Sequence, residues 1–295
     1  MTKVGIIGLG IMGGPMASNL LRAGHDVIGF DVVPSALERL AADGGTKTVS
    51  AAQAAAESDV VITMLPNHPQ VEAVALGEGG VLDSAKPGTL YIDMSSIRPE
   101  TARRLAEVGA ERGVRVLDAP VSGGEKGAVD GVLSIMVGGA AEDFAAAQPI
   151  FDVLGKTIVH VGPHGAGQTV KAANQLVVGG TYALVAEAIV LLEASGIDAG
   201  VGLDVLAGGL AGSRILELKR KSMVERQFAP GFRIDLHHKD MGIILDASRD
   251  AGVALPIGNL VAALIASARA QGYGQLDHSA LLKVAESLSG KGDAA

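Results

Sequence analysis

Hydrophobic residues in the first half of the chain fall into short runs rich in β-branched residues. Segments in which Ala, Leu and Glu repeat at helical spacing separate most of these runs, as in residues 100–112. Strands that alternate with helices predict an α/β domain with a largely parallel, doubly wound sheet. We expect its strands at residues 3–8, 26–31, 60–65, 89–94, 114–119, 133–139 and 157–162.

The hydrophobic pattern changes after about residue 162. Runs of Val and Ile stop, and long segments with helical spacing follow, separated by Gly, Pro or Asp. We therefore predict a Rossmann-type α/β domain over residues 1–162 and an all-helical domain over residues 163–295, joined by a long helix. The expected helices cover residues 166–195, 213–226, 238–251, 257–272 and 278–289.

Composition excludes several classes of function. The 295 residues carry a net charge of −8, which argues against a nucleic-acid surface or a polybasic membrane anchor. The absence of cysteine rules out disulfides, thiolate zinc sites and a cysteine nucleophile. The seven histidines show no metal-binding spacing, so we expect no metal. We expect a cytoplasmic protein without a signal peptide, and its most apolar stretch, residues 176–186, is too short to span a bilayer.

A glycine-rich turn follows the first predicted strand. Gly8, Gly10 and Gly13 have the spacing at which a tight turn lets the backbone approach a pyrophosphate, and the following helix offers its amide groups. The next predicted strand ends in Asp31, where a carboxylate can bind the adenine ribose. Val32 and Val33 offer no cation for a 2′-phosphate. The pattern therefore predicts NAD (NADH) as the cofactor rather than NADP. Ile11 and Met12 belong to the same predicted cofactor-binding loop.

Two later loops are expected to reach the same cofactor, because loops at the carboxyl ends of parallel strands line one crevice. The first is the segment MLPN, in which Met64, Leu65 and Pro66 can pack on the cofactor and Asn67 can make a polar contact. The second contains Ser95 and Ser96, which can bond near the nicotinamide ribose. Alternatively, one of these serines caps the helix that begins near residues 98–99.

Another polar turn follows the predicted strand at 114–119. Its backbone amides can converge on a substrate carboxylate, and its glycines leave room for a ligand. The turn consists of Ser122, Gly123 and Gly124. The alternative is a flexible turn without a ligand.

Lys171 is an isolated cation in an apolar helical segment, with no carboxylate within four residues on either side. One interpretation is a lysine that extends its ammonium to solvent from the helix flank. The other is catalytic: an ammonium can stabilise a developing alkoxide and donate a proton. Burial lowers the pKa of a lysine, whereas a nearby substrate carboxylate raises it. The sequence alone does not show which of these effects on Lys171 is larger. Asn174 would lie on the same helix face.

Four motifs follow one another along the chain: GLGIMGGPMASNL, DAPVSGG, GAGQTVKAANQ and HKDMG. With them the sequence resembles, over essentially its whole length, the β-hydroxyacid dehydrogenase family, which includes 3-hydroxyisobutyrate dehydrogenases and tartronate semialdehyde reductases. The resemblance implies that the three glycines bind the dinucleotide and that Lys171 is catalytic. It further implies substrate-binding roles for Ser122, Gly123, Gly124, Asn174, Phe232, Lys239 and Asp240, with Lys239 also near the nicotinamide end of the cofactor.

Within the family, residues 65–80, 208–216 and 276–282 look most similar to tartronate semialdehyde reductases. This predicts reduction of 2-hydroxy-3-oxopropanoate to glycerate with Lys171 as general acid. The alternatives are a 3-hydroxyisobutyrate dehydrogenase, a broader β-hydroxyacid or semialdehyde reductase, and a non-catalytic nucleotide-binding scaffold. We expect a small-molecule C3 or C4 hydroxy acid or semialdehyde as substrate, no nucleic-acid or membrane partner, and a homodimer or homotetramer.

Overall fold

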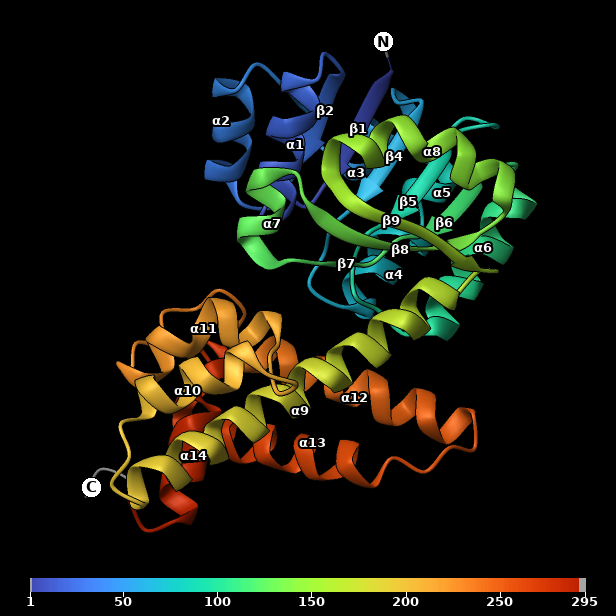
Figure 1. Ribbon diagram of the computed structural model, residues 1–295. Helices are drawn as coiled ribbons and strands as arrows, with labels where there is room; N and C mark the ends of the chain where they lie inside the picture. The colour runs from blue at the N-terminus through green and yellow to red at the C-terminus, as the bar shows by residue number, and fades with distance from the viewer. Residues whose placement is uncertain (1, 292–295) are drawn as a thin grey trace. The chain divides into compact units, whose positions relative to one another are not determined.

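The computed structural model describes residues 2–291. The chain divides into two compact units, Met1–Lys171 and Ala172–Ala295, and the division falls inside helix α9 (Ala166–Ala194) (Figure 1). Each unit has its own hydrophobic core.

The first unit contains a nine-stranded sheet in the order β3-β2-β1-β4-β5-β6-β8-β7, with β9 paired to β8. The strands from β3 to β6 are parallel, whereas β8 runs antiparallel to β6 and β7. Their bounds are β1 Lys3–Ile7, β2 Asp26–Phe30, β3 Thr46–Lys47, β4 Val60–Thr63, β5 Leu90–Asp93, β6 Arg115–Asp118, β7 Val121–Ser122, β8 Leu133–Gly139 and β9 Gly155–Gly162.

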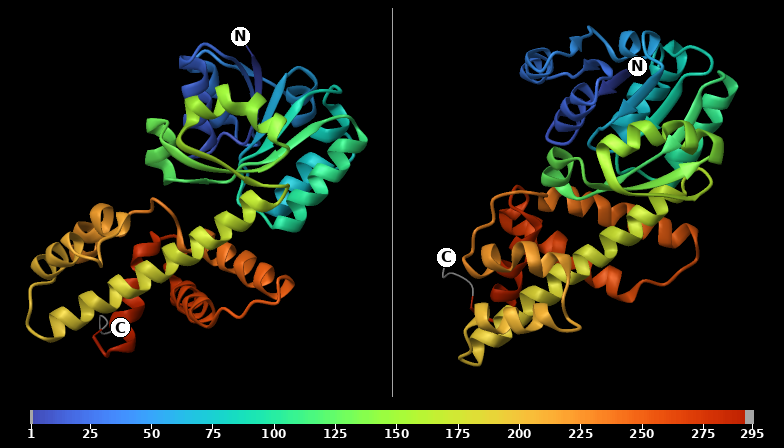
Figure 2. Two further views of the ribbon diagram at one scale, coloured as in Figure 1. Left: turned by 45° about the vertical axis from the view of Figure 1, so that its right-hand side comes forward. Right: turned by 45° about the horizontal axis from the view of Figure 1, so that its top comes forward.

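Helices cover both faces of this sheet because alternate strand residues point to opposite sides. Side chains of α1, α2, α7 and α8 share one core with the sheet, and those of α3 to α6 share the other (Figure 2). The helices are α1 Gly13–Arg22, α2 Pro34–Ala42, α3 Ala51–Ala56, α4 His68–Leu76, α5 Val81–Ser84, α6 Pro99–Glu111, α7 Gly124–Asp130 and α8 Ala141–Leu154. The predicted fold class, a Rossmann-type doubly wound sheet, is confirmed.

In the order β3-β2-β1-β4-β5-β6, successive strands are added on one side of β1 up to β3 and on its other side from β4, although all six strands are parallel. Ligands of open α/β sheets bind outside the carboxyl ends of the strands at such a point. The glycine loop follows β1, and the segment that starts at Met64 follows β4. The topology therefore brings two predicted cofactor segments to this edge.

The second unit is all-helical, as predicted, and its helices gather around the later part of α9 (Figure 2). Asp198 caps α10 through the Val201 amide, and Ser213 caps α11 through the Leu216 amide. The elements are α10 Ala199–Gly208, α11 Arg214–Val224, α12 Ile234–Asp250, α13 Pro256–Ala268, a π-helical turn Arg269–Tyr273, a short 3₁₀ helix His278–Ala280 and α14 Leu281–Leu288.

The apolar helix α9 is longer than the stretch expected from the sequence, residues 176–186. By length and composition alone, its 29 residues are long and apolar enough to cross a membrane, whereas the sequence pattern indicated too short a stretch. However, 44% of its most apolar window is buried inside the protein, and it carries the buried polar residues Gln168, Lys171 and Gln175. One face of α9 therefore packs inside the protein, where it carries polar side chains.

Candidate functional site

The glycine loop between β1 and α1 has the geometry that its spacing predicts. Gly8 has a φ of +95°, and a Cβ there would lie 2.4 Å from the Met64 carbonyl oxygen. A Cβ on Gly13 would lie 1.9 Å from the Gly8 carbonyl oxygen. Chain packing therefore requires both glycines. At Gly10, by contrast, no described residue would bring an atom within 4 Å of a Cβ. Space at this position suits a close approach of a pyrophosphate.

Asp31, directly after β2, holds the glycine loop in place. Its carboxylate accepts a hydrogen bond of 2.6 Å from the Leu9 amide and one of 2.8 Å from the Val33 amide. Val32 follows with 85% of its surface exposed and no positive charge. A groove of about 460 Å³ opens beside the same loop and is lined in part by Gly10 and Ile11. These residues fit a dinucleotide whose ribose is bound by a carboxylate.

The segments after β4 and β5 contact each other. The Leu65 amide donates a 2.9 Å hydrogen bond to the Ser95 hydroxyl, which is fully buried and itself donates to Asp93. Helix α6 begins at Pro99 with Arg98 at its N-cap, so the alternative that Ser95 caps this helix is wrong. Ser96 is partly exposed. Met64, Leu65 and Asn67 are also partly exposed, Pro66 is exposed, and Asn67 accepts a hydrogen bond from the His68 amide at the start of α4.

Two buried carboxylates that the sequence analysis missed end the neighbouring strands β5 and β6. Asp93 and Asp118 are register partners in the sheet, and both are almost fully buried. Burial raises the pKa of Asp93 to about 7, although hydrogen bonds from Ser95 and Thr63 act to lower it. Burial also raises the pKa of Asp118, against the lowering effect of two backbone amides. Their positions after apolar strand runs are the sequence signal that could have identified them.

Asp118 caps the first turn of helix α9. Its carboxylate accepts hydrogen bonds from the amides of Gly165 at 2.7 Å and Gln168 at 3.0 Å. Gly167 allows this approach, since a Cβ there would lie 2.4 Å from the Met136 carbonyl oxygen and 2.8 Å from the Asp118 carboxylate. The motif GAGQ thus brings the start of the lysine-bearing helix against β6 and β8.

The turn at Ser122 is defined by backbone conformation. Gly123 has a φ of +137° and Gly124 a φ of +62°, values that favour glycine. Ser122 ends β7, paired with β8, and Gly124 begins α7. Ser122 and Gly124 are partly exposed and Gly123 is exposed. The backbone of this turn therefore depends on its two glycines, and the turn is open to solvent.

Lys171 is 93% buried, with 7% of its surface exposed, one turn after Gln168. This burial contradicts the alternative of a lysine extended to solvent. Three residues further along α9, the Asn174 side-chain amide donates to Gln175, at 2.9 Å. Gln175 donates in turn to Asp240 at 2.6 Å, and Lys239 forms a 2.9 Å ion pair with the same carboxylate. In the second unit, Gln175, which the sequence did not single out, therefore connects Asn174 with Asp240, and Asp240 in turn binds Lys239.

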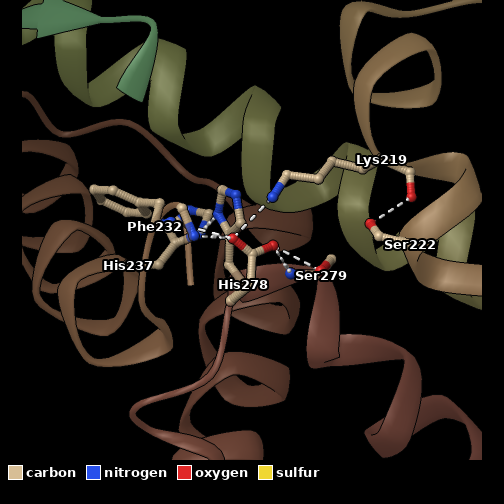
Figure 3. A network of polar contacts seen from close by, with 8 residues as sticks. Lys219, Ser222, Phe232, His237, His278 and Ser279 are labelled. Atoms are coloured by element: carbon tan, nitrogen blue, oxygen red, sulfur yellow. Dashed lines mark hydrogen bonds and ion pairs between the residues drawn. The ribbon is translucent and has the colours of Figure 1, made fainter. Parts of the chain in front are cut away.

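Phe232 lies beside a buried pair of histidines, His237 and His278 (Figure 3). The two imidazoles are 3.1 Å apart between their Nδ1 atoms, and His237 also contacts the Gln175 carbonyl oxygen through Nε2. Asp277 accepts hydrogen bonds from the Phe232 amide and Lys219. Both histidines are buried, His237 completely and His278 with 7% of its surface exposed.

Burial acts to raise the pKa of Asp277, but the opposite effects of His278, Ser279 and Lys219 outweigh it and hold this pKa at about 2. The Asp277 carboxylate thus remains ionised and holds the backbone at Phe232 in place. Among residues 2–291, no group of three or more His, Asp or Glu side chains is arranged to hold a metal ion.

Two family models match consecutive parts of the chain. One describes the NAD-binding domain of 6-phosphogluconate dehydrogenase and covers residues 3–162. The other describes the NAD-binding region of NADP-dependent 3-hydroxyisobutyrate dehydrogenase and covers residues 165–285.

Individual proteins are similar over almost their whole length. The 2-hydroxy-3-oxopropionate reductase of Escherichia coli is 43% identical over 97% of this chain and 98% of its own. The 2-(hydroxymethyl)glutarate dehydrogenase of Eubacterium barkeri is 42% identical over 98% of this chain and 96% of its own. The solved structure of 3-hydroxyisobutyrate dehydrogenase from Mycobacterium tuberculosis with L-serine has a TM-score of 0.88 and 38% identity, covering 96% of this chain and 99% of that one.

Proposed function

Because this chain belongs to the β-hydroxyacid dehydrogenase family of NAD(P)-binding oxidoreductases, we propose that it reduces 2-hydroxy-3-oxopropanoate (tartronate semialdehyde) to glycerate with NADH. The observation that carries the proposal is the burial of Lys171 in a helix whose first turn is bonded to the sheet edge next to the predicted cofactor loops. The 43% identity with a 2-hydroxy-3-oxopropionate reductase supports the choice of substrate.

Lys171 is the proposed general acid. The reduced nicotinamide, when bound, supplies the hydride to the aldehyde carbon. The Lys171 ammonium donates a hydrogen bond to the carbonyl oxygen, stabilises the negative charge that develops there and transfers a proton from Nζ, which completes the alcohol. Burial of Lys171 strengthens this interaction because water screens it less.

Other residues hold the substrate in this proposal. The amides of the turn Ser122 to Gly124 bind its carboxylate, and the Asn174 amide contacts its polar groups. Phe232 shields the reacting centre from water. Lys239 lies at the nicotinamide end of the cofactor, and Asp240, which pairs with Lys239 and accepts from Gln175, keeps that ammonium in one position.

The glycine loop and Asp31 support NADH over NADPH. Gly8, Gly10, Ile11, Met12 and Gly13 form the cradle for the pyrophosphate. Asp31 binds the ribose hydroxyls, while its charge repels a 2′-phosphate, and the exposed Val32 offers no compensating cation. Met64 to Asn67 and the segment at Ser95 and Ser96 complete the cofactor contacts.

The main alternative substrate is 3-hydroxyisobutyrate. It has specific support, because the chain is 38% identical to a solved 3-hydroxyisobutyrate dehydrogenase at a TM-score of 0.88. A steady-state survey of kcat/KM for tartronate semialdehyde, methylmalonate semialdehyde and the corresponding hydroxy acids, each with NADH or NAD and with NADPH or NADP, decides between them. We expect tartronate semialdehyde with NADH to be the best pair. Much faster turnover of methylmalonate semialdehyde would favour the alternative.

We also propose a cytoplasmic homo-oligomer, a dimer or tetramer. Val177, Leu184 and Leu191 lie seven residues apart on α9 and are 67%, 68% and 68% exposed. A heptad spacing places them on one stripe, the pattern with which one helix packs against another. A second copy of the chain offers the same stripe and could cover it.

A further inference from the structure

Gln168 is a buried side chain of the first turn of α9 with both ends of its amide bonded to distant backbone. It is 1% exposed. Its Oε1 accepts a 3.0 Å hydrogen bond from the Ile97 amide, and its Nε2 donates a 2.8 Å hydrogen bond to the Ser95 carbonyl oxygen. One partner is a donor and the other an acceptor, so the site requires a primary amide of this length.

The backbone of the same turn has a second attachment. The Gln168 amide N–H and the Gly165 N–H both donate to the Asp118 carboxylate at the end of β6. The turn is therefore held from two strands, through Asp118 at the end of β6 and through the segment after β5. All of these groups are buried, where hydrogen bonds are strong and an unpaired polar group is costly.

This set of contacts reaches the loop after β4. The Ser95 hydroxyl accepts from the Leu65 amide and donates to Asp93, while the Ser95 carbonyl oxygen accepts from Gln168. The two segments that are expected to touch the cofactor, 64–67 and 95–96, are thus bonded to each other and to the start of α9.

Lys171 lies three residues after Gln168, close to one helical turn. A movement of the first turn therefore displaces the lysine backbone by a similar amount. Displacements of about 1 Å in a catalytic group reduce rates by about a hundredfold.

We propose that Gln168 is a positioning residue that links the two cofactor-binding segments to Lys171, so that binding of the dinucleotide orders the first turn of α9 and places the ammonium for proton donation. This inference rests on the proposed function, since it takes Lys171 as the general acid. It assigns to Gln168 an effect on the chemical step that is separate from cofactor affinity.

The first experiment compares Gln168→Met with Thr169→Val in the full-length enzyme. Methionine has a similar length but cannot make either hydrogen bond, whereas the Thr169 hydroxyl bonds within its own turn, to the Gly165 carbonyl oxygen. For Gln168→Met we expect kcat to fall about 10- to 100-fold while the NADH Kd stays within about threefold, and for Thr169→Val we expect kcat within about twofold of the parent. A Gln168→Met enzyme with the parent kcat would overturn the proposal.

The second experiment does not depend on turnover. Hydrogen exchange of the peptide spanning residues 165–175 is measured with and without saturating NADH. We expect NADH to slow exchange there in the parent and in Thr169→Val but not in Gln168→Met, with residues 8–16 protected in all three. Equal protection of residues 165–175 in Gln168→Met would overturn the coupling.

Turnover and hydrogen exchange together distinguish a failure of the proposed function from a failure of the proposed role of Gln168. A parent enzyme that binds NADH but reduces no semialdehyde contradicts the proposed function, and the exchange experiment still decides the coupling. If Gln168→Met does not fold, Gln168→Glu replaces it, because glutamate keeps the acceptor for Ile97 but loses the donor to Ser95. The same loss of kcat and of NADH-dependent protection is expected in that variant, and parent values of both would overturn the proposal.

Discussion

Lys171 is a buried lysine whose removal should lower the rate of the chemical step without weakening cofactor binding. For Lys171→Ala we expect kcat to fall by about 10²- to 10⁴-fold, because a positioned proton donor contributes about this much. The NADH Kd should change little, since the glycine loop and Asp31 are untouched. Steady-state kinetics and NADH fluorescence titration measure the two values. Lys221→Ala, which removes a lysine whose side chain is 84% exposed, is the matched control, and a Lys171→Ala enzyme as fast as this control would refute the assignment.

Asp31 has an observed structural role and a proposed role in cofactor preference, and a conservative variant can separate the two. Its carboxylate accepts hydrogen bonds from the Leu9 and Val33 amides and also carries the charge expected to repel a 2′-phosphate. Asp31→Asn keeps an acceptor oxygen but removes the charge. The ratio of kcat/KM for NADH to that for NADPH should fall by about tenfold or more, with a modest loss for NADH itself. Asp26→Asn, at the exposed start of strand β2, which ends directly before Asp31, should leave the ratio unchanged. An unaltered ratio in Asp31→Asn would contradict the predicted source of cofactor preference.

The buried carboxyl of Asp93 makes stability depend on pH. Burial raises its pKa to about 7 in the folded protein, from 3.8. Between these values the folded state holds a proton that the unfolded chain has released, so the free energy of unfolding falls as pH rises from about 4 to 7. Asp93→Asn has no carboxyl to titrate, so this contribution to the fall in the free energy of unfolding disappears. Its melting temperature should drop less than that of the parent between pH 5 and pH 8, and the remaining slope reflects groups such as Asp118. An equally steep decline in both proteins would exclude Asp93 as the cause.

At the scale of elements, hydrophobic periodicity predicted the elements that bury many side chains. The predicted strand at 60–65 corresponds to β4, whose four residues are all buried. The strands β3 and β7 were missed because two residues cannot show a period. Helix α10 was missed because its sequence, AGVGLDVLAG, contains three glycines, which weaken the helical pattern.

The candidate site also contains residues that the sequence could predict and residues that it could not. Local motifs predict roles for the glycine loop, the turn at Ser122 and Lys171, since each lies within a short segment with a characteristic composition, and these roles stay predictions. The partners of these groups were not visible, because they come together across long separations. Gln168 and Ile97 are 71 residues apart in sequence, and no period or motif connects them. The pairing of His237 with His278 across 41 residues has the same origin.

Adjacent glycines in α9 offer a sharp test of its packing. A Cβ on Gly179 would lie 2.9 Å from Val261 and 3.1 Å from His237 Nε2, whereas a Cβ on Gly180 would meet nothing within 4 Å among the described residues. Gly179→Ala should destabilise the protein by about 1–3 kcal/mol through overpacking. Gly180→Ala should stabilise it by up to about 1 kcal/mol, because alanine favours a helix interior. Chemical denaturation measures both. Equal effects of the two substitutions would contradict the packing of His237 against this turn.

At the scale of the whole molecule, helix α9 contributes to two different surfaces. Its buried residues, among them Tyr182 and Ile189, belong to the core of the helical unit. Its exposed stripe of Val177, Leu184 and Leu191 is as apolar as that core but faces outward. Contiguous apolar surface of this kind marks an interaction site more often than a free surface. The stripe therefore predicts that the helical unit is where copies of the chain associate.

Substitution in this stripe should lower the oligomeric state without unfolding the protein. The double variant Val177→Lys/Leu184→Lys places two ammonium groups on the stripe, and in a symmetric interface each is opposed by its counterparts from the second copy. Like charges brought together in a desolvated interface are strongly unfavourable. Light scattering coupled to size-exclusion chromatography should show the parent as a dimer or tetramer and the double variant as a smaller species. Val49→Lys, at an 87% exposed apolar position of the first unit, should keep the parent mass. Circular dichroism checks that the double variant remains helical, and a folded double variant with the parent mass would show that the copies associate elsewhere.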